Sequence, residues 1–371
     1  MENEKKRNLL LIIIVAAFLA VLALTLGLVF GLKNFDDDKN EINEIRNNEE
    51  DVEIVNSYDN TEELSEKFPV INNVTILDGI EKNIQNRLLT GFENWNRGFK
   101  AWKKWGDILY TNSSIYNVNG VHMTLAQYQA SMDVTLKRYK IELGQFHNMV
   151  INGNYTAIFY DQYQGEQRTP GTVMEFVRFK DYGEELGTRV VVGWGGTKGN
   201  SFDSMRTYQG DQQRMIQDEQ INLLLHYQIP TTGTLREKYP ILFPVEYLDN
   251  DKANKYIDII LEGFDKWNTG IDDYITWIDQ GYTNNATSYD LNRKQRNMTT
   301  YKDDMKTLNE TYDIKKLYFD NILIRENWAA LHYRYRRKNK NSGEISFGDR
   351  MQFLKFEKKG TNLTIIGSWI Q

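Results

Sequence analysis

Side chains able to do acid–base, nucleophilic or metal chemistry are scarce in this sequence. The 371 residues include no cysteine and only four histidines, which excludes thiolate metal sites and cysteine nucleophiles. No HExxH motif or comparable histidine pair occurs, so we expect neither a bound metal nor a cofactor. The net charge of −6, with acids concentrated near the start of the chain, argues against a nucleic-acid partner.

Three residues remain as candidates for acid–base catalysis: Asp161, Glu175 and His122. The two carboxylates lie in consecutive strand-like stretches, YTAIFYDQYQ and TVMEFVRFK, and His122 precedes a predicted helix. A carboxyl group buried in a pocket can have its pKa raised enough to act as a general base. Asp161 and Glu175 could approach each other across neighbouring strands, although the alternation also permits both to face water or to have structural partners.

Aromatic side chains are the second group of candidates, because they could line a ligand pocket. Rows of aromatic residues at helical spacing are typical of a core, and the functional alternative is stacking on an apolar or sugar-like ligand. His332 lies in the alternating stretch LHYRYRR and could face either side of a strand. The candidates for ligand binding are Trp95, Trp105, Tyr116, Tyr128, Trp267, Trp277, Tyr289, Tyr301 and His332.

Most of these aromatic residues belong to an internal repeat. GFENWNRGFKAWKKWGDILYTN at 91–112 and GFDKWNTGIDDYITWIDQGYTN at 263–284 align without a gap and agree at ten of twenty-two positions. EKFPV at 66–70 likewise recurs as EKYPI at 237–241. The chain therefore carries a duplicated unit, and we expect the two copies to pair with each other within the chain.

Each copy predicts helices followed by strands. An apolar ladder at helical spacing runs through each aligned segment, with a bend or break expected at Gly98 and Gly270. A second helix is predicted to begin after Thr124 (TLAQ) and, with a weaker capping pattern, after Thr300 (TYKD). Four aromatic or β-branched runs bounded by turn residues follow in each copy. This order predicts an α+β fold, with helices packed on one face of a curved antiparallel sheet.

The order of these elements resembles the SnoaL-like branch of the NTF2-like superfamily. The resemblance rests on the FxxWNxG start, on the hairpins from Asn152 to Ala157 and Asn327 to Ala330, and on the final Gly-Trp or Ser-Trp. It covers residues 66–200 and 237–371. It implies two tandem cones, each enclosing a pocket, and enzymes of the family such as polyketide cyclases and ketosteroid isomerases use a carboxylate or a His–Asp pair there.

The two copies disagree at the positions where such chemistry would occur. Asp161 aligns with Arg334, and Glu175 aligns with Gln352. Because the framework agrees while these positions differ, we favour a non-enzymatic role over catalysis. The alternative is an isomerase- or cyclase-type enzyme that acts through a pocket carboxylate in the first copy.

The start of the chain predicts a membrane anchor. Residues 9–32 are apolar, without a charge, and exceed the roughly 20 residues that span a bilayer. Basic residues precede this run and acidic residues follow it, which places the N-terminus in the cytoplasm and the body outside. The predicted organisation is a cytoplasmic stub (1–8), a single transmembrane helix (9–32), an acidic disordered stalk (33–65), a first domain (66–200), a connecting helix or linker (201–236) and a second domain (237–371).

These expectations combine into one function hypothesis. The chain is predicted to be a single-pass, membrane-anchored, extracytoplasmic binding or scaffold protein. Its paired cones would contact either a small apolar ligand or a protein partner of the cell envelope.

Overall fold

The computed structural model describes residues 53–55, 61–196, 223 and 226–370, apart from short gaps at 73, 77, 119–120, 139, 184–187, 290–293 and 360–361. The predicted anchor at 9–32, and most of the predicted linker at 201–236, lie outside these residues. Within the described part of the chain, no helix is both long and apolar enough to cross a membrane. We call residues 61–196 the first repeat and residues 235–370 the second repeat.

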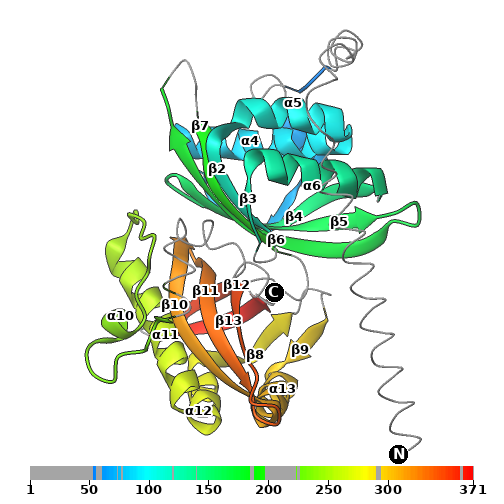
Figure 1. Cartoon of the computed structure of the whole chain (residues 1–371). Coiled ribbons are helices and arrows are strands. Elements are labelled where there is room, and N and C mark those ends of the chain that lie inside the picture. The colour runs from blue at the N-terminus through cyan, green and yellow to red at the C-terminus, as the bar shows by residue number, and fades with distance from the viewer. Residues whose placement is uncertain are drawn as a thin grey trace, which may run out of the picture. The chain divides into compact units, whose positions relative to one another are not determined.

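The first repeat places its helices on one face of a seven-stranded sheet (Figure 1). The order of strands across the sheet is β1-β4-β5-β6-β7-β2-β3, and the four long strands form the expected antiparallel meander. The elements are α3 (Thr61–Lys67), β1 (Val70–Asn72), α4 (Ile80–Asn96), α5 (Phe99–Leu109), β2 (Tyr110–Val118), β3 (Val121–Thr124), α6 (Leu125–Arg138), β4 (Ile141–Asn152), β5 (Tyr155–Gln164), β6 (Thr169–Asp181) and β7 (Thr188–Gly196).

The second repeat has the same plan with a six-stranded sheet, so the predicted α+β class is confirmed for both repeats. Its strand order is β10-β11-β12-β13-β8-β9. The elements are α10 (Leu235–Lys238), α11 (Asn250–Thr269), α12 (Ile271–Gly281), β8 (Tyr282–Tyr289), β9 (Gln295–Asn297), α13 (Met298–Thr311), β10 (Tyr312–Arg325), β11 (Trp328–Asn339), β12 (Ile345–Lys359) and β13 (Asn362–Ile370).

The observed helix ends can be compared with the helix breaks and N-caps predicted from the sequence. The expected breaks occur, between α4 and α5 at Gly98 and between α11 and α12 at Gly270. Thr124 and Gln127 make the expected reciprocal capping bonds at the start of α6. In the second repeat the expected cap at Thr300 is wrong, because Asn297 caps α13 by accepting a hydrogen bond from the Thr300 backbone N–H at 2.8 Å. Asparagine is a stronger N-cap than threonine, so the helix begins one residue after it.

The repeated Trp-Asn pair fastens each long helix to the first long strand. The indole N–H of Trp95 donates to the Ile141 carbonyl at 3.1 Å, and Trp267 donates to the Ile314 carbonyl at 2.8 Å. In each repeat the following asparagine also makes two side-chain hydrogen bonds to the backbone of a single residue, Leu143 or Lys316. These matched bonds make Leu143 and Lys316 structurally equivalent.

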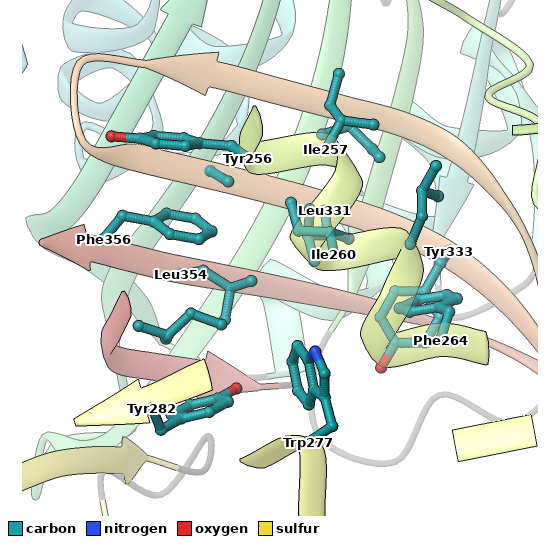
Figure 2. Packing of buried hydrophobic residues seen from close by; sticks show 14 of the residues in the cluster. Tyr256, Ile257, Ile260, Phe264, Trp277, Tyr282, Leu331, Tyr333, Leu354 and Phe356 are labelled. Carbon is teal, nitrogen blue, oxygen red and sulfur yellow. The ribbon is translucent and has the colours of Figure 1, made fainter. Parts of the chain in front are cut away.

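Packing of the second repeat shows how its core forms. Tyr256, Ile260 and Phe264 on α11 point toward side chains of β11 and β12 (Figure 2). The phenol ring of Tyr256 stacks on Phe356, with 4.2 Å between the ring centroids. The helix ladder recognised in the sequence is therefore the face that covers the sheet.

A glycine on each long helix lets the following helix approach closely. A Cβ atom built at Gly263 would lie 2.6 Å from Cη2 of Trp277, and one at Gly91 would lie 2.6 Å from Cη2 of Trp105. Such distances require the indole ring, which is buried in the core, to move. The Gly-Phe start of the repeated segment thus reserves space for the second tryptophan.

We expect Gly263→Ala to lower the free energy of unfolding by about 1–3 kcal/mol, because overpacking a filled core forces strain. Urea unfolding would measure this loss. Gly281→Ala is the matched control, since its Cβ would meet the same indole at an ordinary 3.6 Å. Equal stabilities of the two variants would contradict the packing argument.

The end of the predicted stalk, before residue 66, is more ordered than the sequence predicted. Helix α3 begins at Thr61, inside the predicted stalk, and its Leu64 is buried. The backbone N–H and carbonyl of Val55 are both hydrogen-bonded to the side chain of Asn94, at 3.0 Å each. The stalk boundary at residue 65 is therefore corrected: isolated aliphatic residues in an acidic segment can order it when they dock on an existing core.

The two repeats contact each other through the sheet faces that their own helices leave uncovered. Phe159 packs on Phe353 with 6.2 Å between ring centroids, and Phe176 stacks on His332 at 5.4 Å. The apolar part of this interface consists of Val74, Val150, Tyr155, Ala157, Phe159, Met174 and Phe176 from the first repeat and Leu323, Trp328, Ala330, Met351 and Phe353 from the second.

One buried ion pair joins the repeats beside this apolar interface. The Arg325 guanidinium donates to both carboxylate oxygens of Glu81, at 3.1 and 2.9 Å, and to the Thr75 carbonyl at 3.0 Å. Glu81 also accepts from the backbone N–H of Gly153 at 3.0 Å. Only 4% of the Arg325 side chain and 6% of the Glu81 side chain are exposed.

Candidate functional site

A pocket of about 480 Å³ lies between the helices and the sheet of the first repeat. Its walls come from α4, α5 and α6 and from β2 to β7, so it occupies the space that the resemblance predicted for a cone. Most of the lining side chains are aromatic or aliphatic, and Met123 and Met132 add two thioethers. Such a concave, mainly apolar surface is suited to a small organic ligand.

Glu175 is the one charged side chain among the described residues that line this pocket. The Tyr116 hydroxyl donates to its Oε2 at 2.9 Å, and the Tyr160 hydroxyl donates to its Oε1 at 2.7 Å. Burial raises the pKa of Glu175, while the two tyrosine hydrogen bonds act in the opposite direction. The result is a carboxyl group that holds its proton to higher pH than an exposed glutamate.

Tyrosines surround this carboxyl group and are themselves buried. Tyr128 stacks on Tyr116, with 4.2 Å between ring centroids and 10° between ring planes. Burial, and then the nearby Glu175, raise the pKa of both Tyr116 and Tyr160 well above the ordinary value. Both phenols therefore remain neutral hydrogen-bond donors at physiological pH.

Asp161 lies on the opposite face of the sheet from Glu175. The strand register pairs Asp161 with Thr172 and Glu175 with Ile158, three positions apart, so the two side chains point to opposite sides. Asp161 is completely buried, and its Oδ1 lies 2.6 Å from Nε2 of His147. The structure therefore separates the two carboxylates that the sequence allowed to meet.

The two histidine candidates lie on strands of different repeats, β3 and β11. His122 is in β3, paired with Asn117, and its side chain is outside the described part of the structure. His332 is buried, and its Nε2 lies 2.8 Å from Oδ2 of Asp349. It stacks on Phe176 between the repeats, so its contacts are those of an interface.

The aromatic candidates have different surroundings in the two repeats. Trp95, Trp105, Tyr116 and Tyr128 all line the pocket of the first repeat. In the second repeat, Trp267, Trp277 and Tyr301 are part of the hydrophobic core, and Tyr289 stacks on Trp369 with 5.4 Å between centroids. Sequence reasoning missed Tyr160, although the YTAIFYDQYQ alternation places it on the other side from Asp161.

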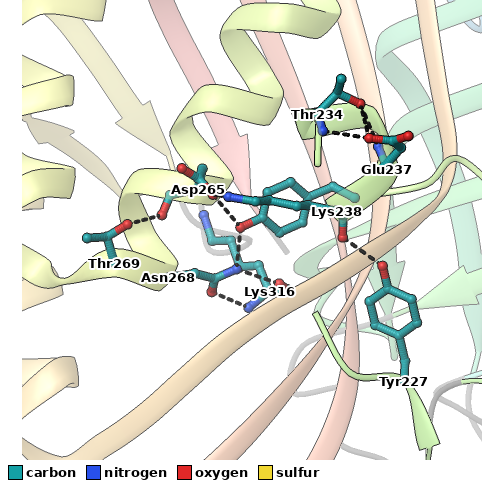
Figure 3. Close-up of polar contacts among 9 residues, drawn as sticks. Tyr227, Thr234, Glu237, Lys238, Asp265, Asn268, Thr269 and Lys316 are labelled. Atoms are coloured by element: carbon teal, nitrogen blue, oxygen red, sulfur yellow. Dashed lines mark hydrogen bonds and ion pairs between the residues drawn. The ribbon is translucent and has the colours of Figure 1, made fainter. Parts of the chain in front are cut away.

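The second repeat holds a lysine where the first has a pocket-lining leucine. Lys316 is equivalent to Leu143, and Figure 3 shows it beside Asn268, whose side chain binds its backbone. Its Nζ lies 4.6 Å from the ring centroid of Phe264 and 5.0 Å from that of Trp267. Burial, and to a smaller extent Arg350, lower the pKa of Lys316 to about 7.

Comparison with known proteins gives structural matches only. No protein-family model and no curated protein matches the sequence. Matching solved structures include a ketosteroid isomerase-like protein from Erwinia carotovora atroseptica (13% identity, TM-score 0.27, covering 33% of this chain and 96% of that one). ActVI-ORFA from Streptomyces coelicolor matches at 9% identity and a TM-score of 0.28, covering 33% and 96%.

An NTF2-like protein of unknown function from Pseudomonas putida KT2440 also matches, at 11% identity and a TM-score of 0.27, covering 34% of this chain and 89% of that one. NTF2-like and ketosteroid isomerase-like proteins are thus among the matches. At these identities and TM-scores the matches assign no activity to this chain.

Proposed function

We propose that this chain is a small-molecule-binding protein whose ligand site is the pocket of the first repeat. The observation that supports the proposal is a space of about 480 Å³ lined by aromatic and aliphatic side chains around one partly buried carboxyl group. Pockets for organic ligands typically enclose about 300–1,000 Å³ and combine apolar walls with a few polar groups. The second repeat supports the first through the buried interface.

The proposal includes the membrane anchor that the sequence predicts at 9–32. A tether would keep the binding domain at the outer surface of the membrane, where it could capture an apolar molecule. A purely scaffolding role explains this placement equally well, but it gives no reason for an apolar pocket that contains the partly buried carboxyl group of Glu175.

Filling the pocket tests the binding proposal. Ser131 and Thr135 on α6 both line the pocket and are incompletely buried, so phenylalanine at both positions would occupy it. We expect the full chain to bind the neutral apolar dye Nile red, and the double variant to bind it at least about tenfold more weakly. Fluorescence titration measures both affinities.

The control for this test is Val134→Phe, which adds the same side chain at a position of α6 that is 61% exposed. It should bind the dye as the unchanged chain does. Absence of dye binding by the unchanged chain, or equal binding by the pocket-filling variant, would contradict the proposal.

A second candidate function is acid–base catalysis by Glu175. The favouring observation is its raised pKa next to two neutral tyrosine donors, an environment in which a carboxyl group keeps its proton to higher pH and can act as a general acid. Glu175→Gln separates the two functions: it would abolish turnover of a substrate while a pure binding site would keep its apolar contacts.

A further inference from the structure

The two repeats contain nearly the same arrangement of four aromatic rings between helices and sheet, which we call the aromatic frame. Phe92 and Tyr160 meet edge to face with 4.7 Å between centroids and 70° between planes, and Phe264 and Tyr333 do so at 4.8 Å and 76°. Trp95 and Trp102 in the first repeat are also edge to face, with 5.4 Å between ring centroids, and so are Trp267 and Tyr274 in the second, at 4.8 Å. The residues at equivalent positions of the two frames can therefore be compared.

The frame of the second repeat contains an amine. The Nζ of Lys316 lies within 4.6–5.8 Å of the centroids of four rings, a spacing at which an ammonium group is attracted to aromatic faces. These rings belong to Phe264, Trp267, Tyr274 and Tyr333. An alkylamine on a hydrocarbon chain is thus accommodated by this frame.

The first repeat has the same frame without the amine. Leu143 stands at the position of Lys316 and lines the pocket. Since leucine is shorter than lysine and has no charge, the space that the amine would occupy remains open. The four corresponding rings of Phe92, Trp95, Trp102 and Tyr160 all line that space.

The two frames also differ in the ionisable side chain that each contains. Where the first repeat has Glu175, the second has Gln352, whose side chain donates to the Ser368 hydroxyl at 2.9 Å. The second frame therefore holds Lys316 without an acid at this position, and burial, with a smaller contribution from the nearby Arg350, lowers the pKa of Lys316 to about 7. The first holds an acid without a base, and burial raises the pKa of Glu175.

We propose that the pocket of the first repeat binds an organic amine whose apolar body contacts the aromatic walls and whose ammonium group pairs with Glu175. This inference rests on the proposed binding function and specifies the class of ligand. Lys316 serves as a built-in counterpart of that ligand in the duplicated frame. No basic side chain is among the described residues that line the pocket, so an anionic ligand would find no partner there.

Three ligands that share one ring system test the charge preference at pH 7. We expect 1-naphthylmethylamine to bind the full chain at least about tenfold more tightly than the neutral 1-naphthalenemethanol, and 1-naphthylacetate to bind most weakly. Isothermal titration calorimetry gives the three affinities. Equal binding of the amine and the alcohol would overturn the amine proposal and leave the binding function intact. Failure of all three, together with Nile red, would overturn both.

Glu175→Gln identifies the group that recognises the amine. Glutamine already occupies the equivalent position 352, so the frame tolerates it. We expect the variant to lose the roughly tenfold advantage of the amine over the alcohol while still binding the alcohol. Glu166→Gln, at an exposed position, is the control and should keep the advantage. An unchanged advantage in Glu175→Gln would overturn the assignment, and circular dichroism would verify folding.

Building the same site into the second repeat provides a test that measures a gain of amine binding and not a loss. Arg350 stands at the position of Val173, because Tyr333 pairs with Arg350 as Tyr160 pairs with Val173. Lys316→Leu, Arg350→Val and Gln352→Glu together give the second frame the residues of the first at these three positions. We expect this triple variant to bind two equivalents of the amine where the unchanged chain binds one. A stoichiometry that stays at one would count against Lys316 as the counterpart of the ligand.

Discussion

Arg325→Met is expected to lower the free energy of unfolding by about 3–5 kcal/mol, the usual cost of removing one partner of a buried ion pair. The loss of the guanidinium leaves the Glu81 carboxylate almost completely buried with one remaining hydrogen bond among those described above, from Gly153. It also leaves the Thr75 carbonyl without the donor that Arg325 supplies. Removing the bidentate cation from a buried carboxylate is more costly than the loss of an ordinary contact, because the charge stays in a low-dielectric environment.

Chemical denaturation with urea measures this loss. Arg236→Met is the control, because Arg236 makes a single surface pair with Asp258 in which both side chains are about half exposed, and such pairs contribute about 0–1 kcal/mol. The double variant Glu81→Met, Arg325→Met should recover much of the stability, since apolar residues often replace a buried pair at little cost. Equal losses in Arg325→Met and Arg236→Met would refute a stabilising role for the buried pair.

The same ion pair shows how the duplicated chain has become asymmetric. Glu81 corresponds to Ala253 in the second repeat, and Arg325 corresponds to Asn152 in the first. A single pair therefore links one helix start to one strand end, with no equivalent on the other side of the interface. Alignment of the repeats predicts the common framework well, but it predicts nothing about contacts that each repeat contributes only once.

The helices and strands were predictable because their signals are local. The break at Gly98 and the Trp-Asn motif follow from spacing within one segment, and the meander follows from alternation and turns. The cap at Asn297 shows the limit of this approach, since Thr300 carried a similar pattern three residues later. Which residue caps a helix depends on which side chain reaches the free N–H groups, and pattern alone does not settle this.

The candidate site depended on strand register, which no local pattern supplies. The sequence named both Asp161 and Glu175, but only the pairing of β5 with β6 reveals that they lie on opposite faces. Lys316 was missed altogether, because a lysine near the start of a strand is normally solvated. Its importance appears only when the hydrogen bonds of Asn268 establish its equivalence to Leu143.

Lys316→Leu is expected to change how stability depends on pH. The folded-state pKa of this lysine is lowered to about 7 from an ordinary value of 10.5. Between these two values the unfolded chain binds more protons at this side chain than the folded chain does. The contribution of Lys316 to stability therefore rises with pH across this window, by at most about 1.4 kcal/mol per pH unit.

The leucine variant lacks this contribution. Its free energy of unfolding should therefore exceed that of the unchanged chain most at pH 6, and this difference should decrease by up to about 3 kcal/mol between pH 7 and pH 9. Urea unfolding of both chains across this range measures the difference, in which all other titrating groups cancel. Lys315→Leu, at the neighbouring partly exposed position that pairs with Asp313, is the control for the loss of a lysine from this strand.

Parallel pH profiles for Lys316→Leu and the unchanged chain would mean that the amine is solvated and not enclosed by the aromatic rings. That result would also remove the structural argument for an amine ligand in the first repeat. A converging profile would instead mean that burial, together with the nearby Arg350, favours the neutral amine of Lys316 over this pH range. The carboxyl group of Glu175 is the acid that the first frame would offer to an incoming ammonium group.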